Sequence, residues 1–440
     1  MAEAETILPA PVHATPVGRR RSSPLPPGAL LIGVTLGFQG VTTYGFLVIA
    51  HRALGAAAYS PFSVLWALIF VAAPGLFLPL EQEVGRAAAA RRVAGLGAGP
   101  LVRRALLLGI GLAVAVMALA GAGEAPLIAD LFQGEGGLLA GFVVAIACYV
   151  LYYLSRGTLA GAGRFGGYAS VLLVEGVARI GAAVVLWRLG VTSGGAYGLA
   201  IGLPCVVGLA VVLPRQRRVA APGPDAHWSE LTSALGWLLT GSLLAQGLTN
   251  VAPLAFQALF GAAHRATAGE ILNGLIIARI PLFLFQAVQA ALMPKLSADA
   301  AAGRLEEFRS LLRRLLLLVG VVVAVSVAAI ALLGPPVLHL LFPSGHPLSR
   351  GDLVLLGLGS EGMMAVLTLA YATIALRGYR GATAAWVAGV AALVVTLVVL
   401  PGTLAKVEGA FCVSVAVAGI AMAAALRSRV ARTARHRGAG

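Results

Sequence analysis

Residues 315–333 read LLLLVGVVVAVSVAAIALL, a run without a charged side chain that directly follows Arg313 and Arg314. An α-helix rises 1.5 Å per residue, so about 20 apolar residues cross the hydrocarbon core of a bilayer, which is roughly 30 Å thick. The run therefore predicts a membrane-spanning helix that begins beside two arginines.

Blocks of this kind recur along the whole chain. Of its 440 residues, 59% are hydrophobic and 11% are charged, whereas soluble domains carry roughly a quarter charged residues. The blocks predict an all-α integral membrane protein with twelve transmembrane helices, at about residues 28–50, 61–80, 105–123, 137–155, 166–186, 196–214, 232–259, 267–293, 315–333, 352–376, 382–400 and 407–426.

The positive charges lie between the blocks and on alternate sides. With the N-terminus inside, 25 of the 32 Lys and Arg residues fall in cytoplasmic segments. The positive-inside rule then predicts a multi-pass protein of the cytoplasmic (inner) membrane with both termini in the cytoplasm. We expect residues 1–27 to form a disordered cytoplasmic tail and residues 427–440 a basic cytoplasmic tail. Because the net charge of +15 is spread over these segments, it does not predict a nucleic-acid partner.

The two halves share an order of features that suggests a six-plus-six duplication. A basic connector follows the second and the eighth predicted spans, and a short Gly/Arg turn follows the fourth (156–164) and the tenth (376–381). We therefore expect two pseudo-symmetric six-helix lobes, 28–214 and 232–426, joined by a cytoplasmic linker at 215–231. Duplicated bundles of this kind often bind their substrate near the midplane and work by alternating access.

Few polar side chains fall within the predicted spans, and these are the candidate site. An intramembrane charge costs about 2.5–3.5 kcal/mol on insertion scales, so it usually faces a cavity or a partner. Arginine suits a phosphate ligand because its planar fork binds phosphate oxygens bidentately. The predicted cavity residues are Arg52, Arg156, Arg179, Gln246, Asn250, Asn273 and Arg279, and Glu175 and Glu270 are predicted to couple an ion or form a salt bridge. The simpler interpretation is that Glu175 and Arg179 neutralise each other and that Arg279 extends toward water.

Two stretches also carry a family resemblance. Arg52-Ala53-Leu54-Gly55, followed by Tyr59, Phe62 and Trp66, and the run 156–165, followed by Tyr168, Glu175 and Arg179, resemble bacterial polysaccharide flippases of the multidrug/oligosaccharidyl-lipid/polysaccharide (MOP) exporter superfamily. With the helix count, the resemblance covers about residues 28–426. It implies a MATE-like fold and a flippase that moves an undecaprenyl-pyrophosphate-linked oligosaccharide across the membrane for cell-surface or extracellular polysaccharide synthesis. Such a protein would meet membrane lipids and the lipid-linked glycan, with H⁺ or Na⁺ as candidate coupling ions and a polysaccharide polymerase as a candidate partner.

Two alternatives remain open. A cation-coupled multidrug exporter of the same superfamily would use acids such as Glu175 and Glu270, although arginines stand close to both. A membrane glycosyltransferase or polymerase would need room on short outer loops. The sequence has no His-Glu-x-x-His, Cys-x-x-Cys or Walker motif, and Gly161-x-Gly163-x-x-Gly166 follows an apolar helix rather than a strand. We therefore expect no metal, no cofactor and no enzymatic activity.

Overall fold

The protein is helical throughout the part of the chain that its structure, a computed structural model, describes: residues 29–216, 220–231, 235–261, 263–282, 296, 298–300, 302–343 and 348–438. The tail predicted at 1–27 lies outside these residues. Ten of the described helices are long and apolar enough to cross a membrane. The all-α membrane fold expected from the sequence is confirmed.

The helices follow one another with short connections. They are α1 (Ala29–Val93), α2 (Gly99–Ala122), α3 (Glu124–Pro126), the π-helix η1 (Leu127–Leu131), α4 (Gly136–Gly161), α5 (Phe165–Arg188), α6 (Gly194–Gln216), the 3-10 helix η2 (Trp228–Glu230), α7 (Leu235–Phe260), α8 (Thr267–Ala278), α10 (Leu305–Leu341), α11 (Arg350–Ala375), α12 (Tyr379–Val399) and α13 (Leu404–Gly438).

Helix α1 contains the first two predicted spans. Its backbone is non-helical at Gly55, with φ 71° and ψ 166°, a conformation that glycine tolerates best. The rings of Phe46 and Trp66 lie 5.8 Å apart between centroids, whereas 20 residues of straight helix would separate them by about 30 Å. The chain therefore turns back at Gly55 and forms two antiparallel limbs.

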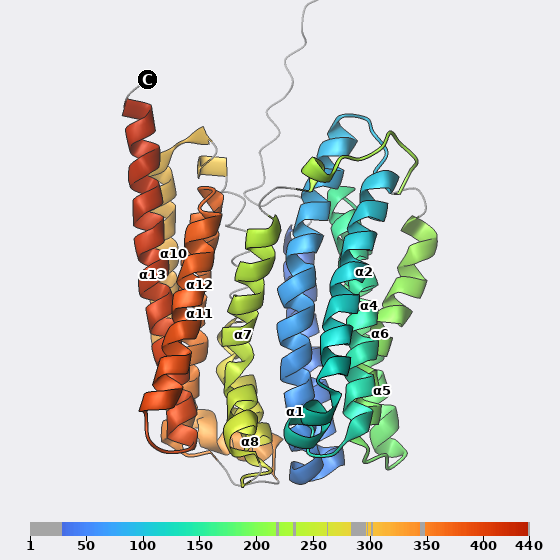
Figure 1. Ribbon diagram of the computed structural model, residues 1–440, viewed down its shortest axis with the longest axis vertical. Helices are drawn as coiled ribbons and strands as arrows, with labels where there is room; N and C mark the ends of the chain where they lie inside the picture. The colour runs from blue at the N-terminus through green and yellow to red at the C-terminus, as the bar shows by residue number, and fades with distance from the viewer. Residues whose placement is uncertain are drawn as a thin grey trace, which may run out of the picture.

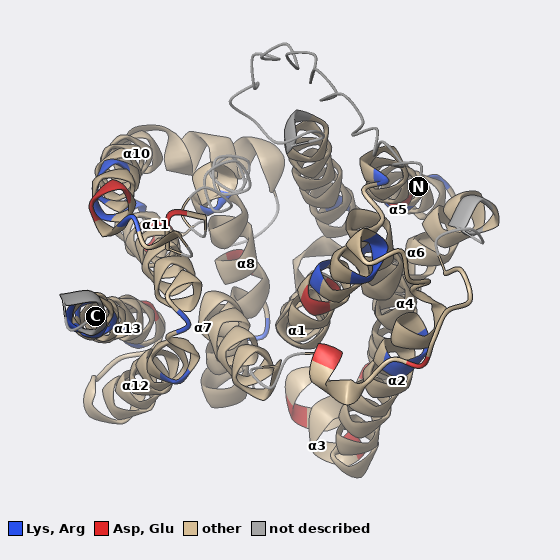
Figure 2. Ribbon diagram, turned by 90° about the horizontal axis from the view of Figure 1, so that it is seen from above, with Lys and Arg blue, Asp and Glu red and all other residues tan. Residues whose placement is uncertain are grey.

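The helices form two groups, seen end-on in Figure 2. Helices α1 to α6 make the first lobe, and α7 to α13 make the second. In Figure 1 the C-terminus and the loop between α1 and α2 lie at the top, whereas η1 and α8 lie at the bottom. We name the top the basic end, because it carries Arg91, Arg92 and the arginines that close α13, and the bottom the opposite end.

The observed helices run past most of the predicted spans. The second limb of α1 continues to Val93 instead of residue 80, and α13 continues to Gly438 through the predicted basic tail. The eighth predicted span is a helix over Thr267–Ala278, and part of it lies outside the described residues. Hydropathy marks where a helix leaves the hydrocarbon, and the backbone stays helical beyond that point.

Close contacts between helices hold the first lobe together. A Cβ atom added to Gly202 of α6 would lie 2.6 Å from the Cα atom of Ala145 in α4. Likewise, a Cβ atom at Gly176 of α5 would lie 2.7 Å from the hydroxyl of Thr42 in α1. Small residues allow this approach, which membrane helices use for packing. The approach of α5 to α1 also brings the polar side chains of the two helices together.

Candidate substrate site

Arg279 lies where the two lobes meet. It follows the last residue of α8, its side chain is 9% exposed, and its guanidinium donates to Oδ1 of Asn250 at 3.1 Å and to the backbone carbonyl of Thr249. The amide of Asn250 in turn approaches the carbonyl of Phe70 in α1 at 3.5 Å. Both acceptors of Arg279 are uncharged, and its Nε has no hydrogen-bond partner among the described residues.

The neighbourhood of Arg279 includes polar groups from both lobes. Tyr44 of α1 lies within electrostatic range of Arg279 and of Glu361 in α11. Tyr44, Asn250, Arg279 and Glu361 all lie 10 to 12 residues from the opposite end of their helices, which is about 15–18 Å along each axis. That depth is close to the middle of a bilayer, so we name these four residues the midplane cluster.

Glu361 was not among the residues predicted from the sequence. Its side chain is fully buried, and neither carboxylate oxygen has a hydrogen-bond partner in the described part of the chain. Burying a carboxyl group without a partner is costly, whether or not it carries a proton. The signal was available, because Glu361 is an acid inside the predicted span 352–376, and an acid at that depth marks a candidate functional group.

Glu175 and Arg179 form a buried ion pair within α5, as their spacing of four residues predicts. Arg179 also donates to the hydroxyl of Thr43 at 2.9 Å, and the Gln39 amide donates to the second carboxylate oxygen of Glu175. The exposed fractions of the two charged side chains are 2% or less. The pair is therefore neutralised within the first lobe and tied to α1.

Arg156 belongs to a different group, near the basic end. It pairs with Glu81 at 3.2 Å and donates to the hydroxyl of Tyr168 at 2.6 Å, while that hydroxyl donates to Glu81 at 3.0 Å. Its guanidinium also lies 5.1 Å from the ring centroid of Tyr152, within cation-π distance. These contacts join α1, α4 and α5, so Arg156 links helices of the first lobe.

The other predicted residues do not share one place. Arg52 is exposed and donates to the carbonyls of Leu340 and Leu341 at the end of α10, at 3.1 and 3.4 Å. Gln246 lines a cavity of about 90 Å³ between α1, α7, α11 and α12. Asn273 is buried in α8, where its Oδ1 has no partner among the described residues. Glu270 lies one turn earlier and is partly buried.

Of the predicted set, the structure thus brings Asn250 and Arg279 together in one place, with Glu175 and Arg179 as a separate pair. Among the described residues, no cluster of three or more His, Cys, Asp or Glu side chains could hold a metal ion. The midplane cluster offers one guanidinium, one amide, one phenol and one carboxyl group. Such a set can bind and release a polar ligand.

Comparison with known proteins agrees with this architecture. No protein-family model matches the sequence. Uncharacterized proteins of Mycobacterium bovis and Mycobacterium tuberculosis are 24% identical over 380 residues, which cover 80% of this chain and 78% of theirs. An inward-facing multidrug resistance MATE family transporter of the MOP superfamily superposes with a TM-score of 0.69 at 15% identity, over 92% of this chain and 99% of that one. The Vibrio cholerae MATE transporter VcmN, in a mutant form, gives 0.67 at 15% identity over 93% and 97%.

The chain has the fold of the MATE transporters. This confirms the MATE-like arrangement expected from the sequence, and the transporter class agrees with the expectation that the chain is not an enzyme. The MATE fold is shared by proteins with different cargo. The cargo must therefore be argued from the residues of the site.

Proposed function

We propose that this protein is an exporter that moves a lipid-linked, undecaprenyl-pyrophosphate-bearing oligosaccharide across the cytoplasmic membrane by alternating access. The observation that carries the proposal is Arg279. It is a buried cation near the midplane, between the lobes, whose observed acceptors are an amide and a backbone carbonyl. A buried charge without a counter-charge is costly, and an anionic ligand would supply one.

The surrounding groups fit the two parts of such a cargo. The guanidinium of Arg279 would bind pyrophosphate oxygens, exchanging its hydrogen bond to Asn250 for stronger charge-assisted bonds. The amides of Asn250, Gln246 and Asn273 would offer donors and acceptors to sugar hydroxyls. Because α8 belongs to the second lobe and Tyr44 to the first, movement of one lobe against the other would carry the bound group from one side to the other.

Translocation in proteoliposomes tests the proposal. A lipid-linked oligosaccharide in the inner leaflet becomes accessible to a sugar-oxidising reagent outside only after it has crossed. We expect Arg279→Gln to slow translocation at least about tenfold, because a hydrogen bond to a charged group contributes roughly 1.5–3 kcal/mol, and Arg279→Lys to retain part of the rate. The matched control is Arg188→Gln, which removes an exposed arginine at the end of α5.

Loss of activity in both Arg279 variants and in the control would indicate general damage. Wild-type translocation in Arg279→Gln would remove the basis of the proposal. In cells, deletion of the gene should trap the glycan-lipid on the cytoplasmic leaflet, and normal surface glycan in the deletion strain would contradict the proposed cargo.

Glu361 favours a second candidate, a cation-coupled multidrug exporter. A fully buried carboxyl group without a hydrogen-bond partner in the described chain could exchange H⁺ or bind Na⁺ or an organic cation. Under this function, Glu361→Gln abolishes efflux of a cationic dye, and Arg279→Glu favours the dye over the pyrophosphate lipid. Dye efflux by the wild type without translocation of the lipid would replace the first candidate with the second.

A further inference from the structure

A cavity of about 430 Å³ lies at the basic end of the first lobe, apart from the midplane cluster. Three segments meet there: the loop from α1 into α2, the turn after α4, and the linker that leaves α6. Ala98, Ala162 and Pro222 each represent one of these segments in its lining. The cavity is therefore bounded by three separate connections of the chain.

The charged side chains that line this cavity are two arginines, Arg92 and Arg164, and no Asp or Glu lines it among the described residues. Both arginines are exposed. Arg92 is held in place because its Nη1 donates to the carbonyl of Ala162 at 2.8 Å. The cavity thus concentrates positive charge without a matching acid in its walls.

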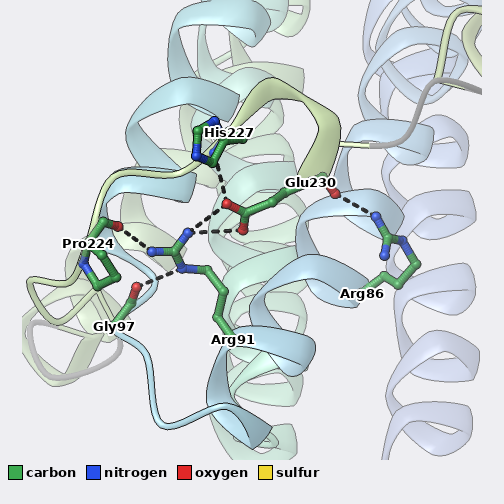
Figure 3. A network of polar contacts seen from close by, with 6 residues as sticks. All are labelled: Arg86, Arg91, Gly97, Pro224, His227 and Glu230. Carbon is green, nitrogen blue, oxygen red and sulfur yellow. Dashed lines mark hydrogen bonds and ion pairs between the residues drawn. The ribbon is translucent and has the colours of Figure 1, made fainter.

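The linker wall of the cavity is fixed by a network of polar contacts, drawn in Figure 3. Arg91, of which 4% is exposed, donates to both carboxylate oxygens of Glu230 at 2.9 and 3.0 Å, to the carbonyl of Gly97 at 2.9 Å and to the carbonyl of Pro224. The backbone N–H of Gly99 also donates to the carbonyl of Ala221 at 3.0 Å. The linker therefore stays against the loop that opens α2, and the cavity has firm walls.

The cavity lies at a depth where phosphate groups are abundant. Helix α4 has 26 residues and begins at the opposite end, so it is about 39 Å long. A bilayer with its headgroups is roughly 40–45 Å thick. Arg164, three residues beyond α4, therefore stands near the headgroup layer of the leaflet at the basic end.

We propose that this cavity binds an anionic phosphate group through Arg92 and Arg164. Two guanidinium groups can each bind phosphate oxygens bidentately, and the volume can hold a phosphate with part of its substituent. The headgroup of an anionic phospholipid and a soluble phosphate share this chemistry. The site does not depend on the cargo of the transporter, so it holds even if the proposed function fails.

Thermal unfolding of the purified full chain in neutral detergent tests the site. The probes are inorganic phosphate, short-chain phosphatidylglycerol and, as the neutral comparison, short-chain phosphatidylcholine. We expect a phosphate-bearing anion to raise the Tm of the wild type, and the Arg92→Gln/Arg164→Gln double variant to bind at least about tenfold more weakly, from the loss of charged hydrogen bonds. Arg103→Gln is the matched control, because Arg103 is an exposed arginine of α2 that does not line the cavity.

The arms of the experiment separate the two sources of phosphate. A shift with phosphatidylglycerol alone assigns a lipid headgroup, and a shift with inorganic phosphate assigns a soluble anion. If the double variant does not fold, Ala162→Asp adds a carboxylate to the lining without removing either arginine, and it should also abolish the shift. An equal shift in wild type, Arg103→Gln and Ala162→Asp, or no shift with any anion, would overturn the proposal.

Discussion

At the scale of single residues, the three buried arginines differ in what neutralises them. Arg179 has an acid one helical turn away, and Arg156 has Glu81 together with aromatic rings. Arg279 has an amide and a carbonyl. A buried ion pair adds little to stability in total, whereas a single buried charge without its partner is expensive. The first two arginines therefore fit a structural role, and the third fits ligand binding.

The Glu175–Arg179 pair should behave as a unit. Either Glu175→Gln or Arg179→Gln leaves one uncompensated charge inside the first lobe and should destabilise the protein by about 3–5 kcal/mol. The double variant should recover much of that loss, because no unpaired charge remains. A double-mutant cycle on unfolding in detergent measures the coupling. Strictly additive losses would show that the pair is not coupled.

The sequence could predict those polar contacts that depend on local spacing. The Glu175–Arg179 pair follows from helical periodicity, and the facing of Asn250 and Arg279 follows from two adjacent spans. The contact between Glu81 and Arg156 could not be predicted in this way. It joins residues 75 positions apart, and it requires α1 to pack on α4, which no local pattern specifies.

At the scale of helices, hydropathy located the crossings but not the ends of the helices or the turn in α1. Apolar content falls where a helix enters the headgroup layer, although its hydrogen bonds continue. The turn at Gly55 spans one residue with a positive φ, where the sequence predicted a gap of ten residues between spans. A single glycine gives little signal of this, because the chain contains 56 glycines.

Gly55 should be intolerant of a side chain. With φ at 71°, Gly55→Ala should destabilise the protein by about 1–3 kcal/mol, because L residues are strained in that region. Gly37→Ala is the matched control in the same helix, where an added Cβ meets no atom within 4 Å, and it should be neutral or stabilising by up to about 1 kcal/mol. Thermal unfolding in detergent compares the two. Equal effects would show that the turn does not need glycine.

The linker on the first lobe should respond to acid. Burial raises the pKa of Glu230, but the backbone N–H of His227 and the guanidinium of Arg91 outweigh it, so the net shift is downward from 4.5. A lowered pKa stabilises the contact above pH 4.5, and that stabilisation is lost as the pH falls below this value. Amide exchange of residues 220–231, corrected for intrinsic rates, should therefore stay slow at pH 7 and rise below pH 4.5.

Variants separate this contact from a general effect of acid. Arg91→Gln should speed exchange of the same segment at pH 7, whereas Arg103→Gln should not. Fast exchange in the wild type at pH 7 would contradict the clamp.

At the scale of the whole molecule, the two lobes are joined at the opposite end by a small set of hydrogen bonds. The Gln133 amide of the first lobe donates to Oε1 of Gln257 in α7 at 3.2 Å and to the carbonyl of Arg265 at 2.9 Å. Gln257 donates to the carbonyl of Asp130 at 2.9 Å. Gln133 has a φ of 52°, a conformation that costs energy in a residue other than glycine. Such contacts can form and break within a transport cycle.

Alternating access requires these contacts to separate, so a tether across them should stop transport. Each native cysteine is first replaced by serine, and Gln133→Cys is combined with Gln257→Cys. A short bifunctional methanethiosulfonate should then abolish translocation, and a reductant should restore it. The control pair is Glu135→Cys with Gly194→Cys. Both of its positions lie in the first lobe, and a Cβ atom at Gly194 would be 2.6 Å from Oε2 of Glu135, so its tether should leave transport unchanged. Full transport through the tethered first pair would mean that the opposite end does not open, and that cargo crosses by a route that leaves these two lobes in place.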